Sequence, residues 1–286
     1  MEKIEKYIYE AIASSQHYYD NFNDNSKIVD VGVYLHDIVS YVTGRHSNIT
    51  QTMIEETLNN SNYFKERIIT ITKDGKSVKS KSNSYMLSKP IYFKYRRQAP
   101  KSDKKWLFDI FKNSHLYAAK YIELNDVMEG FSWYSVNGYN QTILERIINE
   151  KQTINICSLC RNINNPIMWA HYADSFKGVS IGVEISDSNT VIPIKYTNIP
   201  VELAPYSKDT VQDILSKKLE CWKYEREVRM FSDSKYIDTN IRIVFLGQRM
   251  SKYSKGKMKR FLNKIDSDII VVDDFRCDVS LSSNKF

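Results

Sequence analysis

The residues best suited to chemistry lie in the stretch CWKYEREVRM, positions 221–230. Glu225 and Glu227 stand two positions apart there, and Arg229 follows two positions later. On a β-strand, which alternates its side chains between two faces, all three would share one face and bring two carboxylates together, as a chemical site needs. On a helix, Glu225 and Arg229 would instead form a surface ion pair worth roughly 0.3–0.5 kcal/mol. The secondary structure predicted around this stretch must decide between the strand and the helix.

Several familiar nucleotide-binding and catalytic motifs are absent from the chain. It has no G-x-G-x-x-G, no P-loop, no H-E-x-x-H and no G-x-S-x-G. Cys157 and Cys160 have a zinc-like spacing, but no second pair exists to complete four ligands, so packing cysteines are the better interpretation. His171 is the histidine with the best case for a chemical role. However, a helical histidine beside aromatic residues, here Trp169 and Tyr172, is more often a packing residue than a base.

The composition indicates a cytoplasmic protein. The 286 residues suffice for one large domain or two ordinary ones, and a hydrophobic content of 42% can fill a core. No run of about 18 apolar residues exists, and the start of the chain lacks the apolar region of a secretory signal, so we expect no membrane contact. Four cysteines are too few for a disulfide scaffold of this size, which indicates a reducing compartment.

The net charge of +7 is unevenly distributed. The segment 65–105 contains 13 basic and 3 acidic residues, and the segment 249–264 contains 7 basic residues and no acidic one. Since these segments carry +10 and +7, the rest of the chain carries −10. A basic stripe on an acidic body is typical of a contact with nucleic acid or an acidic partner, and a solvated lysine-rich face is an equal alternative.

Helical spacing of apolar residues predicts three helices in the N-terminal part, over residues 2–20, 31–44 and 48–60. After them, Asp74 and Gly75 separate two strand-like runs, a pattern typical of a β-hairpin. Three helices followed by a hairpin is the order of a winged helix-turn-helix. We therefore predict a winged-helix-like N-terminal module over residues 1–89, closed by Pro90.

The hairpin of this module would place a basic wing against nucleic-acid phosphates. Its four lysines are Lys73, Lys76, Lys79 and Lys81. The helix over 48–60 would be the recognition helix, but it contains no lysine or arginine, which weakens a role in the major groove. Nucleic-acid binding and a structural or partner-binding role therefore stay equal alternatives.

Strands and helices alternate through the remaining residues, 90–286, and predict an α+β domain. The strands are expected at 91–97, 153–160, 178–185 and 241–247, with a strand running into a turn over 115–131. The helices are expected at 104–113, 137–151, 165–174 and 210–222.

Six segments of this domain resemble a large bacterial family known only as a domain of unknown function. They are FKYR, LND, ICSL, MWAHYADSFKGVSIG, CWKYEREVRM and IVFLG, and they come in the family's order. The family pattern is roughly Y-x-Y-R, N-D-P, S-F-S, M-W-x-H-Y and W-x-Y-E-x-E-x-R, and the match covers residues 91–247. The chain departs from it at Val127, where the family usually has proline, and at Cys160, where it often has serine.

The motif order also resembles that of the R-S-E class of ADP-ribosyltransferases. Those enzymes have an arginine on the first core strand, then a Ser-x-Ser strand, then a Glu-x-Glu pair before a late strand. Arg96, Ser158, Glu225 and Glu227 follow this order, although Ser-x-Ser is only half kept. The resemblance implies an ADP-ribosyltransferase-like split β core with helices over residues 90–286.

The resemblance also implies NAD as a substrate, without a metal. Cleaving its nicotinamide–ribose bond builds positive charge on the ribose. Glu227 would stabilise that charge, Ser158 would orient Glu227 or the ribose, and Glu225 would activate the acceptor. Arg96 would hold a phosphate or the ribose.

Four rings complete the expected NAD site: Tyr95, Trp169, His171 and Tyr172. They would stack on or contact nicotinamide or adenine, although core packing is the better expectation for Trp169.

The expected function is therefore ADP-ribosyl transfer to a macromolecule, or simple NAD cleavage. Family-level analogy suggests a bacterial toxin or a phage-defence effector. The alternative is a non-catalytic regulatory protein that binds nucleic acid or a partner through the winged helix. A nuclease is a third option, for which only Asp273 and Asp274 stand out.

Overall fold

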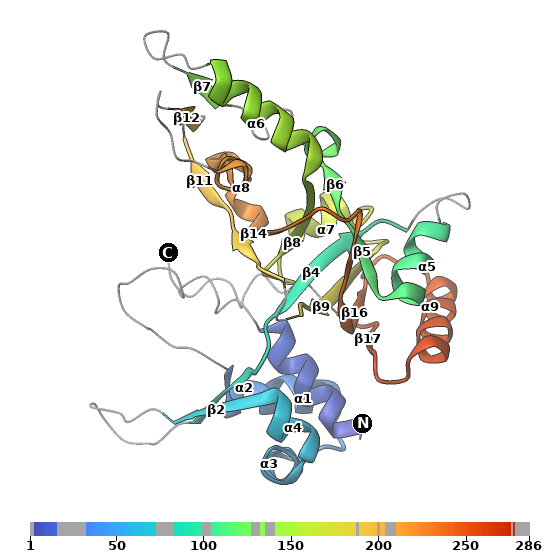
Figure 1. Ribbon diagram of the computed structural model, residues 1–286. Helices are drawn as coiled ribbons and strands as arrows, with labels where there is room; N and C mark the ends of the chain where they lie inside the picture. The colour runs from blue at the N-terminus through green and yellow to red at the C-terminus, as the bar shows by residue number, and fades with distance from the viewer. Residues whose placement is uncertain are drawn as a thin grey trace.

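The computed structural model describes residues 3–15, 33–72, 83–98, 104–126, 132–134, 141–186, 189–198, 201–203, 210–275 and 277. They form a large β-sheet with helices against both faces, and a group of helices with a small sheet lies at one end (Figure 1). The predicted α+β class is confirmed.

The N-terminal group contains four helices and a three-stranded antiparallel sheet in the order β1-β3-β2. The helices are α1 (Lys3–Ser14), α2 (Leu35–Arg45), α3 (Gln51–Asn60) and α4 (Asn62–Arg67); the strands are β1 (Val33–Tyr34), β2 (Ile68–Thr72) and β3 (Asn83–Leu87). The predicted helix over 31–44 begins only at Leu35, because Val33 and Tyr34 pair with β3 instead. The hairpin prediction is supported by the antiparallel pairing of β2 with β3, but the four wing lysines lie outside the described residues.

Glu10 on α1 is a buried carboxyl that accepts a hydrogen bond from the hydroxyl of Tyr41 at 2.6 Å. Burial raises its pKa to about 7. Because this pKa is higher in the folded than in the unfolded state, the stability that Glu10 contributes is fully present below about pH 4.5 and is lost as the pH rises through about 7.

We therefore expect Glu10→Gln, which keeps an acceptor for Tyr41, to raise the free energy of unfolding by about 1–3 kcal/mol near pH 8.5. Near pH 5 the gain should be much smaller, because Glu10 is already protonated in the folded state. Urea denaturation at both pH values measures the difference. An equal gain at the two pH values would contradict the assignment.

The large sheet has the strand order β10-β14-β8-β4-β9-β16-β17, with β6 also paired to β8. Its strands are β4 (Ile91–Arg96), β6 (Ala119–Lys120), β8 (Asn155–Cys160), β9 (Val179–Glu184), β10 (Ile192–Pro193), β14 (Glu227–Ser232), β16 (Asn240–Leu246) and β17 (Ile270–Val272). Its described pairs are antiparallel, apart from the parallel pair β16 and β17.

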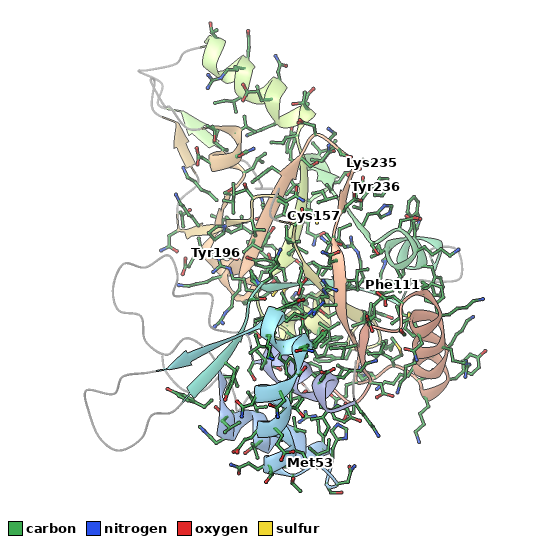
Figure 2. The ribbon with its side chains drawn as sticks, turned by 60° about the horizontal axis from the view of Figure 1, so that its bottom comes forward. Met53, Phe111, Cys157, Tyr196, Lys235 and Tyr236 are labelled. Carbon is green, nitrogen blue, oxygen red and sulfur yellow. The ribbon has the colours of Figure 1, made fainter. Side chains whose placement is uncertain are left out.

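Two hydrophobic clusters cover the two faces of this sheet. On one face, α5 (Lys104–Asn113) and α9 (Lys252–Ile265) lie side by side (Figure 1), with the rings of Phe108 and Phe261 4.3 Å apart. Phe111, labelled in Figure 2, is fully buried there. On the other face, α7 (Pro166–Tyr172) and the N-terminal helices share one continuous cluster with Phe93 of β4.

A peripheral group lies at the end opposite the N-terminal helices (Figure 1). It contains α6 (Gln141–Thr153), α8 (Val211–Ile214) and the parallel pair of β7 (Ser132–Tyr134) and β12 (Val201–Leu203). Two further pairs are β5 (His115–Tyr117) with β15 (Tyr236–Asp238) and β11 (Lys195–Thr197) with β13 (Lys217–Leu219). In the part of the chain that the structure describes, no helix has both the length and the apolar character needed to cross a membrane.

The predicted helix over 210–222 is wrong in its second half. It ends at Ile214, and the chain then forms strand β13 and the 3₁₀ helix η4 (Glu220–Glu225). Leu215 and Lys218 are buried together here, and Lys195 of β11 donates its backbone N–H to Ser216. Strand pairing has overridden the helical pattern of this segment.

Candidate active site

A cavity of about 440 Å³ opens where two central strands of the large sheet part. β4 pairs with β9 over six residues, but it meets β8 only where Phe93 lies beside Cys160. Further along β8, the short strand β6 takes the neighbouring place, with Ala119 opposite Ile156. Residues of β4, β8, α7, η4 and the segment after β5 line the cavity. Its volume lies within the range of small-molecule sites, about 300–1,000 Å³.

At the parting of β4 and β8, the side chain of Lys94 on β4 reaches the backbone carbonyl of Ser158 on β8. The Lys94 ammonium donates to this oxygen at 2.6 Å. Burial lowers the pKa of Lys94 to about 8. A buried amine therefore holds the two strands together across the opening.

Glu227 is the first residue of β14 and lies beside Cys160 of β8. Two cations hold its carboxylate: Arg229 donates from Nε at 2.7 Å and from Nη2 at 3.3 Å, and Lys218 donates from Nζ at 3.1 Å. The hydroxyl of Ser158 adds a further hydrogen bond. Arg229 is fully buried on the same strand face, and its Nη1 donates to the carbonyl of Leu215. The helical alternative, with Arg229 in a surface ion pair, is wrong.

Glu225 reaches the same cavity, but it does not lie on one strand with Glu227, as the strand alternative would have it. It is the last residue of η4, and Arg226 after it has φ 45° and ψ 47°, the left-handed conformation. This sharp change of direction, uncommon for a residue other than glycine, separates Glu225 from β14. Lys218 donates to Glu225 at 2.6 Å, and the hydroxyl of Tyr172 donates at 2.5 Å.

The two carboxyls have opposite pKa shifts. Burial and the charge of Glu227 raise the pKa of Glu225, against the opposing effects of Lys218 and Tyr172. Burial also acts to raise the pKa of Glu227, but Arg229 and Lys218 outweigh it and hold that pKa well below its ordinary value. Glu227 therefore stays ionised, while Glu225 is the carboxyl that gains and loses a proton more readily. Environments that separate two pKa values in this way are how paired carboxyls acquire different roles.

Most of the predicted site residues line this one cavity. Those that do are Tyr95, Arg96, Ser158, Tyr172, Glu225 and Glu227. Arg96 ends β4, where strand alternation places its side chain on the sheet face opposite Tyr95. The guanidinium that contacts Glu227 belongs to Arg229 instead.

Trp169 and His171 do not line the cavity, contrary to the prediction that they contact a cofactor. Trp169 is fully buried, with its indole N–H donated to the carbonyl of Ile163 at 2.9 Å and its ring edge-on to Tyr95. His171 is exposed on α7, with its Nδ1 3.4 Å from the hydroxyl of Tyr224. Their spacing on a short helix directs one into the core and the other towards solvent.

No role was predicted for Lys218, Arg229 or Tyr196, which help to hold the carboxylates. The hydroxyl of Tyr196 accepts the backbone N–H of Glu227 at 2.8 Å. Arg229 was detectable, because a strand places it on the face of Glu227. Lys218 could not be recognised in this way, because its segment has a helical pattern in the sequence.

Cys157 and Cys160 lie on opposite faces of β8, in two different hydrophobic clusters (Cys157 is labelled in Figure 2). This agrees with packing cysteines. Among the described residues, no group of three or more His, Cys, Asp and Glu side chains is arranged to hold a metal ion. Asp273, considered for a nuclease, accepts a hydrogen bond from Lys259 at 2.8 Å.

The site is thus a cavity in a parted sheet, with two carboxylates around one buried lysine and a tyrosine hydroxyl on the more basic carboxylate. Such a site can stabilise a developing positive charge and accept one proton. Comparison of this chain with protein-family models, curated proteins and solved structures finds no match.

Proposed function

We propose that this protein cleaves the nicotinamide–ribose bond of NAD and transfers the ADP-ribosyl group to a macromolecule or to water. The single observation that carries the proposal is the pair Glu225 and Glu227 in one cavity, joined by Lys218, with pKa values shifted in opposite directions. Cleavage of a glycosidic bond passes through an oxocarbenium-like ribose, for which paired carboxyls of unequal pKa are suited.

Each residue has a role in this reaction. As the bond between ribose C1′ and the nicotinamide nitrogen breaks, the bonding electrons pass to the ring and neutral nicotinamide leaves. Glu227, kept ionised by Arg229, stabilises the positive charge on the ribose. The acceptor then forms a bond to C1′, and Glu225 takes up the acceptor's proton. Tyr172 orients Glu225 through its hydroxyl.

The arrangement of strands supports the predicted domain types. The parting of β4 and β8 is consistent with an ADP-ribosyltransferase-like split core over residues 90–286. The order of α1, β1, α2, α3, α4, β2 and β3 is consistent with a winged-helix-like module over residues 1–89 that carries the additional short helix α4. NAD would be a substrate here rather than a resident cofactor.

The experiment is incubation of the purified protein with NAD, alone and with bacterial lysate. We expect release of nicotinamide in both samples and, for a transferase, label from adenylate-labelled NAD on protein or nucleic acid in the second. Absence of both nicotinamide release and label transfer would contradict the proposal.

A second candidate function, binding of nucleic acid, is favoured by the surface of α9. This helix contains no acidic residue. Four of its exposed residues follow one face at helical spacing: Tyr253, Lys257, Arg260 and Lys264. Tyr253 is 77% exposed, so its ring is open to stacking on a base. A line of cations with an exposed aromatic ring is a common surface for a nucleic-acid backbone.

We expect the double variant Lys257→Ala/Lys264→Ala to weaken binding of single-stranded nucleic acid and to lower the slope of log K against log salt by about 1–2. Fluorescence anisotropy at several salt concentrations measures this slope. The matched control is Lys112→Ala/Lys195→Ala, which removes two exposed lysines from other elements. Equal losses in the two variants would indicate a general charge effect and refute a site on α9.

A further inference from the structure

A second cavity, of about 460 Å³, adjoins the one described above. Arg96 and Tyr117 line both cavities. The other walls come from α5, from β5 and from β15 with the residue before it. Figure 2 shows Lys235 and Tyr236 next to each other at this edge of the molecule.

Aromatic rings dominate one part of the second cavity. Trp106 at the start of α5 is 65% exposed, which is unusual for the largest apolar side chain. On the β5–β15 side, His115 and Tyr236 stack with their ring centres 4.3 Å apart and their planes at 20°. Tyr117 meets Tyr236 edge-on at 6.0 Å. The cavity therefore combines an exposed indole with a preformed stack of rings, both suited to hold a flat heterocycle.

The charges around these rings are mainly positive. Arg96, Arg97 and Lys235 line the cavity, and Asp109 is the acidic residue among its lining side chains. Asp109 is already engaged, since its two oxygens contact His115 at 2.8 Å and the amide of Asn113 at 2.7 Å. Three cations against one carboxylate that is already hydrogen-bonded favour a ligand with phosphate groups.

We propose that the second cavity binds a nucleoside diphosphate moiety. Its base contacts Trp106 and the stack of Tyr236 on His115, and its phosphates contact the three cations. Two sources share this chemistry: the ADP half of a dinucleotide that spans both cavities past Arg96, or a separate nucleotide. The first source rests on the proposed NAD chemistry, whereas binding of a nucleotide as such does not.

The test is calorimetric titration of the full chain with ADP, adenosine and inorganic phosphate. We expect ADP to bind more tightly than either fragment. Trp106→Ala should weaken ADP binding about tenfold or more, because it removes a stacking partner from an exposed position. Lys235→Ala should weaken ADP but not adenosine. The matched control is His36→Ala, which removes an exposed ring from α2, outside both cavities.

Absence of ADP binding at millimolar concentration, or an equal ADP affinity in Trp106→Ala and the wild-type chain, would overturn the proposal. ADP inhibition of NAD cleavage distinguishes the two sources: competitive inhibition identifies the ADP half of the substrate, and non-competitive inhibition identifies a separate nucleotide. If ADP binds through Trp106 while NAD is never cleaved, the nucleotide site stands and the proposed function fails. If NAD is cleaved but ADP binds Trp106→Ala as tightly as the wild-type chain, the nucleotide site fails and the proposed function stands.

Discussion

Replacement of Glu225 by glutamine is expected to lower the rate of ADP-ribosyl transfer by about 10²–10⁴-fold, the usual contribution of a general base. The amide keeps the size of the side chain and an acceptor for the hydroxyl of Tyr172, but it cannot take up the acceptor's proton. Because burial already disfavours the charge on Glu225, the fold should tolerate the change. Nicotinamide release and label transfer from NAD, with a thermal unfolding curve for each variant, measure both effects.

The matched control is Glu184→Gln. Glu184 is also a buried carboxylate on the large sheet, paired with Arg242 at 2.8 Å, but it does not line the cavity. We expect this variant to retain its activity while it folds. If Glu225→Gln is as active as the control, then Glu225 is not the base.

Replacement of Arg229 by methionine is expected to lower the free energy of unfolding by about 3–5 kcal/mol. Arg229 is fully buried, and its guanidinium bonds both oxygens of Glu227 and the carbonyl of Leu215. Methionine can fill the apolar part of the space, but it leaves a buried carboxylate for which, among the described residues, Lys218 is the remaining ion-pair partner. Urea unfolding at neutral pH measures the loss.

The double variant Arg229→Met/Glu227→Gln provides the control for this prediction. Removing the charge of Glu227 as well should recover part of the stability, because no carboxylate is then left without its guanidinium. Lys218 still has Glu225 as a partner at 2.6 Å. Equal or additive losses in the single and double variants would show that Arg229 stabilises the fold by packing rather than by its contact with Glu227.

Both predictions concern the network of charges around Glu225 and Glu227. They distinguish its role in proton transfer from its role in holding Glu227 ionised. Glu225 and Tyr172 face the cavity, where Glu225 can exchange a proton, whereas Arg229 keeps Glu227 ionised from inside the protein. Buried ion pairs cost desolvation energy, and their usual value is in holding groups in place rather than in stability. Two like charges therefore lie close together here because Lys218 lies between them.

The sequence alone determined the elements with a clear period. The strand around Arg96, the strand with Ser158 and the late strand ending at Leu246 were predicted within a few residues. Burial alternates along β4, whereas β8 and β16 are buried along most of their length, and both patterns can be recognised from the local sequence. Part of the candidate site followed, because Arg96 and Ser158 lie on two of these strands.

Only the tertiary structure decided which charges meet. Lys218 lies in a segment with a helical pattern, yet pairing with β11 makes it a strand and buries its ammonium between the two glutamates. Arg226 adopts a left-handed conformation that no local pattern indicated, and the position of Glu225 follows from it. Tertiary packing likewise decided that Trp169 lies in the core and that Arg229 is the guanidinium bonded to Glu227. The physical reason is that periodicity reports which face of an element is buried, whereas the partners of a buried charge come from elements distant in sequence.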